Sequence, residues 1–206
     1  LFAIPIVLTN LVQQLYSMVD LMVIGKFVGS IGTVGVNTGG EIADLVGPVA
    51  MGFSSAGQIY IAQLAGARSD EKIKRPVGTL LGCMLSIAVV LTVATIAFSN
   101  PLLRLLNCPE EAMDQARDYM IITAIGIPFT FGYYAVCGIL RGMGESKRPL
   151  LFILIAAAIN IVLDILLVAV FKMEAAGTAI ATTLAQFGSF AAAFVFMLKK
   201  KEKFDF

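Results

Sequence analysis

The sequence VGTLLGCMLSIAVVLTVATIAF, residues 77–98, decides the fold class of this chain. It contains no charged residue, and a basic cluster precedes it while Asn100-Pro101 follows it. An α-helix needs about 20 predominantly apolar residues to cross the hydrocarbon core of a bilayer. The stretch lacks the alternation of apolar and polar residues that the strands of a membrane barrel require. We therefore predict a transmembrane helix here.

Five more apolar stretches of similar length lie on either side of it, separated by charged or turn-forming residues. The six predicted spans are about 2–24, 42–65, 77–98, 117–140, 150–171 and 177–198. The whole chain is 58% hydrophobic and 14% charged, whereas an average soluble domain has about 25% charged residues. The sequence thus predicts an all-α polytopic membrane protein, a six-transmembrane-helix bundle in which residues 1–206 form a single lobe.

The break before the second span is predicted at Gly39-Gly40, because paired glycines favour turns. This break places Glu41 and Asp44 at the start of a helix. Acidic residues at a helix N-terminus interact favourably with the helix dipole and can reach water. We therefore interpret these two acids as structural residues.

Lys and Arg residues divide unequally between the loops on the two sides of the membrane. One set of loops contains Arg68, Lys72, Lys74, Arg75, Arg141, Lys147, Arg148, Lys199, Lys200, Lys201 and Lys203. These are eleven of the fifteen basic residues, and cytoplasmic loops are the ones that carry such an excess. We expect a multi-pass protein of the inner (plasma) membrane with both chain ends in the cytoplasm. In this topology the loop 99–116 is external, and an impermeant thiol reagent should reach Cys108.

Composition excludes several classes of function. The chain has no histidine, which removes Ser–His and Cys–His catalysis and His-ligated zinc. Its three cysteines, Cys83, Cys108 and Cys137, are far apart and predict neither a zinc site nor a disulfide framework. The net charge of +1 offers no basic field for nucleic acid. We expect a protein that is not an enzyme, needs no cofactor and contacts the lipid bilayer.

Two carboxylates, Asp20 and Asp164, interrupt the predicted spans away from the loops. A charged side chain at the centre of a membrane helix costs at least about 2.5–3.5 kcal/mol. The presence of these two carboxylates therefore indicates a functional role. A helical rise of about 1.5 Å per residue places Asp20, Asp164 and Thr182 at comparable depth in the outer half of the bundle. Asn160 precedes Asp164 by four residues and shares its helix face. We predict that these four residues form a site of hard oxygen atoms that takes up a proton or a small cation.

The first span carries a polar stripe that ends in Asp20. Gln13, Ser17 and Asp20 share one helix face, and we expect Gln13 and Ser17 to belong to a polar network beside the site. The alternative for both is hydrogen bonding between helices, which polar side chains often provide in membranes. Pro5 removes a backbone hydrogen bond and lets the helix bend, although a proline can equally well start a helix.

Short motifs occur in a specific order along the chain. They are Pro5 with Val19-Asp20 and Val23-Ile24-Gly25, Gly52 to Ala67 with Ala62-Gln63, Leu140-Arg141-Gly142-Met143-Gly144 with Pro149, Asn160 to Asp164, and Gly177 to Thr182. In their order and spacing these motifs resemble the amino-terminal half of a multidrug and toxic compound extrusion (MATE) transporter. The resemblance covers essentially the whole chain.

The resemblance implies one six-helix lobe of a twelve-helix secondary antiporter, which exports organic, mainly cationic, compounds in exchange for H⁺ or Na⁺. The implied cation site consists of Asp20, Asn160, Asp164 and Thr182, and no other metal is implied. Gln13 and Tyr119 match positions in the surrounding polar network, and Pro5 matches a proline linked to bending of the first helix. The implied partners are a small organic substrate and a missing carboxyl-terminal six-helix lobe, or a second copy of this chain.

Three alternatives compete with this interpretation. A lipid-linked oligosaccharide flippase of the same superfamily would need basic residues in its cavity for anionic headgroups, and no Lys or Arg lies deep in a predicted span. An intramembrane aspartyl protease would use two span aspartates, but its YD and GxGD signatures are replaced by Val19-Asp20 and Leu163-Asp164. A purely structural or assembly subunit is the third alternative, and the cost of keeping carboxylates in a membrane argues against it.

Overall fold

The computed structural model describes residues 3–67 and 73–199, apart from the side chains of residues 3–6 and 10. Within these ranges six helices are long and apolar enough to cross a membrane, which confirms the predicted all-α membrane fold. The long helices are α1 (Ala3–Phe27), α2 (Ser30–Gly66), α3 (Lys74–Ala97), α5 (Met113–Gly142), α6 (Lys147–Asp164) and α7 (Glu174–Lys199). Three short helices complete the described part: α4 (Ser99–Leu105), η2 (Glu110–Ala112) and the π-helix η3 (Ile165–Val170), which continues α6.

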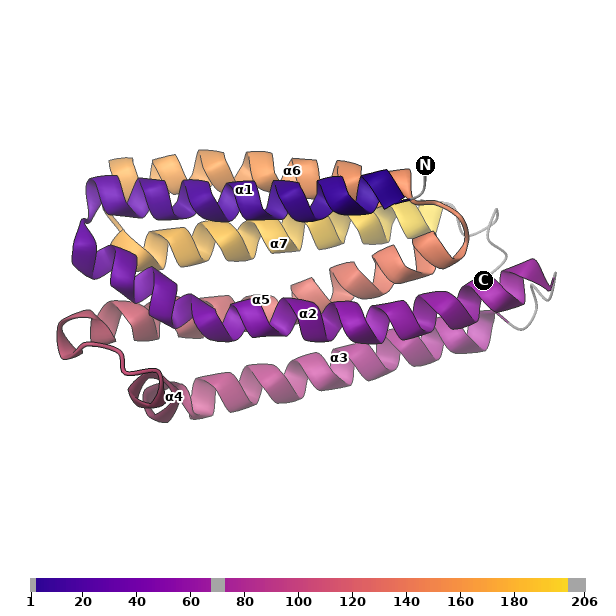
Figure 1. The fold of residues 1–206 in the computed structure, drawn as a ribbon, viewed down its shortest axis with the longest axis horizontal. Helices are drawn as coiled ribbons and strands as arrows, with labels where there is room; N and C mark the ends of the chain where they lie inside the picture. The colour runs from indigo at the N-terminus through magenta and orange to yellow at the C-terminus, as the bar shows by residue number, and fades with distance from the viewer. Residues whose placement is uncertain (1–2, 68–72, 200–206) are drawn as a thin grey trace.

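The long helices run side by side along the longest axis of the molecule (Figure 1). In this view α1, α6 and α7 form one group, and α2 and α3 form the other with α5. α5 joins the two groups, because it packs against α2 and α3 and also against α7. It is the most buried of the six long helices, as its central position requires.

The outer surface of the bundle is apolar. On α3, the side chains of Leu85, Val89, Val90 and Val93 are each at least half exposed. A soluble monomer rarely exposes an apolar patch of this kind, because water penalises it. Lipid does not, so the exposed face of α3 has the character of a membrane surface.

The start of α2 differs from the prediction, because the helix begins at Ser30 and continues through Gly39-Gly40. These glycines serve close packing and form no turn. A Cβ atom on Gly39 would lie 2.5 Å from the carbonyl oxygen of Ala116 on α5, and one on Gly40 would lie 3.4 Å from the ring of Tyr119. The close approach of α5 offsets the loss of about 1 kcal/mol that each helical glycine brings relative to alanine.

The prediction that Cys108 is accessible to a thiol reagent is also wrong. Its side chain is only 8% exposed, because it packs into a cluster with Leu103, Ala112, Ala116 and Met120. The sulfur lies 3.7 Å from the carbonyl oxygen of Pro109. Burial raises the pKa of the Cys108 thiol above its ordinary value, so the residue is a poor target for alkylation.

Candidate functional site

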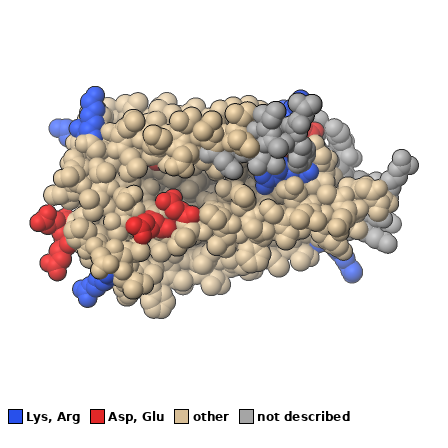
Figure 2. All heavy atoms as spheres, viewed as in Figure 1, with Lys and Arg blue, Asp and Glu red and all other residues tan. Residues whose placement is uncertain are grey.

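A cavity of about 590 Å³ opens between α1, α2, α5, α6 and α7. Figure 2 shows the molecular surface hollowed between α1 and α2, with acidic atoms at the edge of the hollow. The residues that line the cavity include two carboxylates, Asp20 and Asp44, and no Lys or Arg. Four tyrosines also contribute to the wall: Tyr16, Tyr119, Tyr133 and Tyr134. The cavity wall is therefore polar and aromatic, and a smaller hollow that shares Tyr133 and Tyr134 with it is also lined by Arg141.

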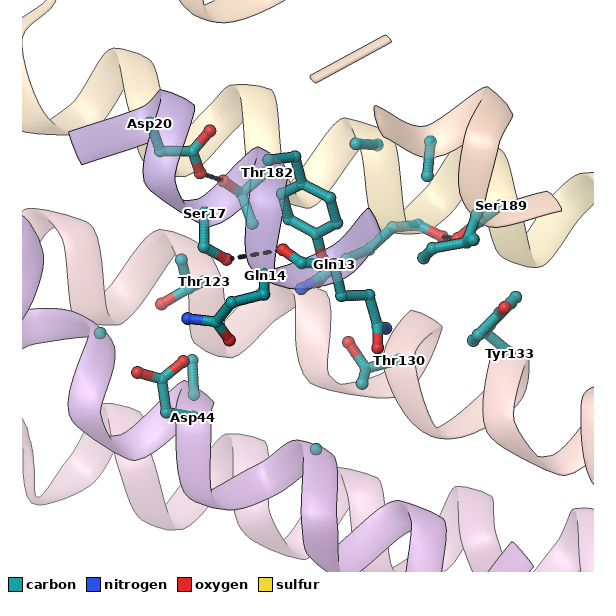
Figure 3. A pocket seen from close by; sticks show the side chains of 18 of the residues that line it. Gln13, Gln14, Ser17, Asp20, Asp44, Thr123, Thr130, Tyr133, Thr182 and Ser189 are labelled. Carbon is teal, nitrogen blue, oxygen red and sulfur yellow. Dashed lines mark hydrogen bonds between the residues drawn. The ribbon is translucent and has the colours of Figure 1, made fainter. Parts of the chain in front are cut away.

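Asp20 lies where α1, α6 and α7 meet at one end of this cavity. Its side chain is only 5% exposed, and those of Asn160 and Asp164 are fully buried. The Thr182 hydroxyl donates a hydrogen bond to Asp20 Oδ2 over 3.2 Å (Figure 3). Asn160 Nδ2 in turn donates to Thr182 Oγ1 over 3.4 Å. The structure thus brings together Asp20, Asp164 and Thr182, which the sequence predicted to lie at comparable depth, and Asn160, which it predicted to share a helix face with Asp164.

Several oxygen atoms in this cluster are buried without a hydrogen-bond partner among the described residues. They are Asp20 Oδ1, Asn160 Oδ1 and both carboxylate oxygens of Asp164. The hydroxyl of Thr178, one turn before Thr182 on α7, is likewise buried without a partner among the described residues. A buried polar atom left unsatisfied costs about 1–3 kcal/mol, and a charged one costs more. The two carboxylates also interact electrostatically with each other. A proton or a cation bound among these oxygens would relieve both penalties.

Backbone geometry changes beside the same cluster. α6 ends at Asp164, and the π-helix η3 begins at the next residue. Its Val168 is buried against Ile24 of α1 and Ala179 of α7. π-helical segments are rare and occur frequently at functional sites, so Asp164 stands at a junction where the helix deviates from ideal geometry.

The predicted polar network lies along the cavity between Asp20 and the opposite end of α1. Gln13 Nε2 donates to the Tyr134 hydroxyl over 3.4 Å, whereas the Ser17 hydroxyl donates to the backbone oxygen of Gln13 over 3.2 Å. Tyr119 is 7% exposed and interacts electrostatically with Asp20. The side chain of Pro5 lies outside the described residues, so its predicted role in helix bending remains a prediction.

Sequence reasoning missed two residues of this region. Thr178 is fully buried and lies one turn before Thr182 on α7; the spacing of four residues between the two threonines was the available signal. Asp44 was interpreted as a structural acid at a helix start. In the structure it lies in the interior of α2 and lines the cavity, because α2 begins fourteen residues before it.

Comparison with known proteins gives consistent matches. The MatE family model matches residues 5–166. The chain is 31% identical to "Probable multidrug resistance protein YoeA" of Bacillus subtilis over 100% of this chain and 45% of that protein. It is also 31% identical to "Probable multidrug resistance protein YpnP" of the same organism, over 98% of this chain and 45% of that protein. A structure titled "Crystal structure of MATE in the bent conformation" superposes with a TM-score of 0.92 at 23% identity, over 98% of this chain and 45% of the other.

Proposed function

Because the chain belongs to the MatE family, we propose that it is the cation-binding lobe of a secondary antiporter. This antiporter exports organic, mainly cationic, compounds in exchange for inward H⁺ or Na⁺. The observation that carries the proposal is the buried pair Asp20 and Asp164, of which three carboxylate oxygens lack a hydrogen-bond partner among the described residues. Ionisable residues inside membrane helices are rare and mark ion or proton pathways.

Each residue of the cluster has a distinct part in the proposed ion binding. Asp20 and Asp164 supply the negative charge that attracts H⁺ or Na⁺, and Asn160 and Thr182 supply neutral oxygens. Na⁺ prefers such hard oxygen ligands, and a proton would be shared by the two carboxylates. Gln13, Ser17 and Tyr119 form the polar surroundings of the pair.

Neutralisation of the pair would change how α1 packs. Asp20 is the only carboxylate that α1 contributes, and it connects α1 to α7 through Thr182. Ion binding removes the repulsion between Asp20 and Asp164 and favours a different position of α1. We propose that Pro5 allows this helix to bend during the change.

Transport needs a second half. The chain spans about 45% of the length of the curated relatives that it matches. Alternating access in transporters of this kind requires two units that rock against each other around the substrate site. We propose that the other unit is a carboxyl-terminal six-helix lobe or a second copy of this chain. We place the assembled transporter in the plasma membrane with both ends of this chain in the cytoplasm.

The cavity lining separates this proposal from the flippase alternative. A lipid-linked oligosaccharide carries an anionic headgroup, which needs Lys or Arg partners. The residues that line the cavity include no basic side chain, and the smaller hollow that adjoins it adds only one among the described residues, Arg141. The acidic, aromatic wall instead favours a cationic compound with apolar rings.

The test is coupled export by an Asp20→Asn variant of the assembled transporter in proteoliposomes. We expect export driven by a proton or sodium gradient to fall at least about tenfold, because the charge that binds the ion is lost. Asp114→Asn, at an exposed acid in the first turn of α5, is the matched control and should export normally. Normal export by Asp20→Asn, with unchanged dependence on pH and sodium, would show that the ion site lies elsewhere.

A further inference from the structure

The wall of the cavity opposite Asp20 carries a second carboxylate, Asp44. It projects from α2 across the cavity toward Gln14 and Ser17 of α1 (Figure 3). The structure gives this carboxylate no hydrogen-bond partner among the described residues, and its side chain is exposed to the cavity. Glu41 lies one helical turn away on α2 and adds to the negative potential at Asp44. A carboxylate in this position is not explained by helix capping, because it lies in the interior of a 37-residue helix.

The surroundings of Asp44 leave room for a large group. The α2 residues that line the cavity include several small ones near Asp44: Gly40, Ala43, Gly47 and Gly52. A Cβ atom at Gly47 or at Gly52 would meet no other atom within 4 Å. These two glycines are therefore not required for helix packing within the described chain, and their small size keeps the cavity wide next to the carboxylate.

The other walls of the cavity supply aromatic surface. Tyr16 of α1 and Tyr119, Tyr133 and Tyr134 of α5 line the same cavity as Asp44. Aromatic faces attract cations and also pack against apolar rings. A volume of about 590 Å³ falls within the range of about 300–1,000 Å³ that is typical of pockets for small organic ligands.

We propose that Asp44 is the residue that recognises the positive charge of the exported compound, separately from the Asp20–Asp164 pair that binds the coupling ion. This proposal rests on the proposed function, since it names the substrate-recognition residue of the same transporter. Asp20 and Asp44 differ in exposure and in hydrogen bonding, as the two proposed roles require. Asp20 is 5% exposed and hydrogen-bonded to Thr182, which suits a small ion, whereas Asp44 is exposed and lines the cavity. The substrate class is a bulky organic cation whose charge pairs with Asp44 while its rings contact the tyrosines.

The experiment compares two ligands of similar shape and different charge. The transporter, formed by this chain with its proposed second half, is placed in lipid nanodiscs, and the binding of tetraphenylphosphonium and of neutral triphenylphosphine oxide is measured. Asp44→Asn should weaken tetraphenylphosphonium binding at least about tenfold and leave binding of the neutral compound nearly unchanged, because only the charge pair is lost. Asp44→Glu should restore much of the affinity for the cation, and Asp114→Asn should bind both ligands like the wild-type protein.

Four outcomes would overturn the proposal. Wild-type affinity for tetraphenylphosphonium in Asp44→Asn would show that the carboxylate does not recognise the cation. An equal loss of both ligands would show that the substitution changes the shape of the cavity and not its charge. Absence of gradient-driven tetraphenylphosphonium export by the wild-type transporter in proteoliposomes would overturn the proposed function, and this assignment with it. Coupled export that depends on Asp20 but not on Asp44 would overturn this assignment alone.

Discussion

Asp20 and Asp164 are both buried and interact with each other, so the charge on one carboxylate changes the energetic cost of charging the other. Thr182 donates a hydrogen bond to the Asp20 carboxylate, and neither oxygen of Asp164 accepts a hydrogen bond from a donor group of the described residues. Two close carboxylates cannot both ionise without a large cost, and we propose that this pair binds a single ion or proton as a unit. The effects of substitutions at residues that act as a unit are not additive.

This coupling predicts the behaviour of the double variant. Asp164→Asn should lower gradient-driven export at least about tenfold, as Asp20→Asn does, and the residual rate of the double variant should lie within about threefold of that of either single variant. The measurement is the initial rate of uptake of a fluorescent organic cation into everted vesicles, which corresponds to export from cells, at equal protein content. Additive losses in the double variant would mean that the two acids act at independent sites.

The sequence was sufficient to predict this pair for a physical reason. Charged residues are conspicuous in apolar stretches, and the fixed rise of a helix converts sequence position into depth. Thr178 escaped prediction because threonine hydroxyls in membrane helices commonly bond to their own backbone, as Thr123 does to the Tyr119 oxygen. The role of Asp44 escaped prediction because it depends on where α2 begins: a start near Gly40 would make Asp44 a residue of the helix N-terminus, whereas the actual start at Ser30 places it in the helix interior.

Cys108 provides a separate prediction at the residue scale. Burial and a raised pKa reduce the thiolate at Cys108, so its labelling by an impermeant maleimide near neutral pH should be at least about tenfold slower than that of an exposed cysteine. Labelling should accelerate as the pH rises toward the raised pKa. Glu111→Cys, in the same loop but exposed, is the reporter for an external position, and it should react rapidly in intact cells. Equal labelling rates at the two positions would contradict the buried state of Cys108.

At the scale of helices, α2 and α5 pack closely against each other beside the cavity, and we call this contact the seam. Gly39 of α2 contacts the backbone of Ala116, and Gly138 of α5 contacts Ser54, whose hydroxyl donates to the Tyr134 oxygen over 2.6 Å. Gly78 and Gly82 of α3 have the GxxxG spacing of a packing motif, yet a Cβ atom at either would meet nothing within 4 Å in the described chain. Spacing alone therefore could not tell which glycines are packed, because packing depends on the neighbouring helix.

The seam predicts opposite effects of alanine at two helical glycines. Gly39→Ala places a Cβ atom 2.5 Å from a backbone oxygen that cannot move aside, so it should lower the free energy of unfolding by about 1–3 kcal/mol. Gly78→Ala meets no atom, and it should be neutral or stabilise the helix by up to about 1 kcal/mol. Thermal unfolding in the same detergent measures both. A Gly39→Ala variant as stable as Gly78→Ala would refute the close packing of α2 on α5.

At the scale of the whole molecule, the bundle has an apolar exterior and a polar cavity that opens on one side of it. Figure 2 shows the hollow at the surface of this chain, and in a membrane such a polar opening cannot face lipid without a large penalty. The number and type of the helices were predictable from hydrophobic length, because the bilayer imposes that length. We propose that another unit covers the cavity, and the residues of this chain alone do not specify the surface of that unit.

An open cavity predicts that this chain alone does not transport. Residues 1–206 reconstituted without a second lobe should give no export of tetraphenylphosphonium above background under an imposed proton or sodium gradient, since one wall cannot alternate access. Binding of tetraphenylphosphonium should persist in the same preparation, because Asp44 and the four tyrosines all belong to this chain. Cross-linking in the same liposomes reports whether the chains are monomers. Export by a monomeric preparation would refute the need for a second half, whereas export that appears only together with cross-linked dimers would identify that half as a second copy of this chain.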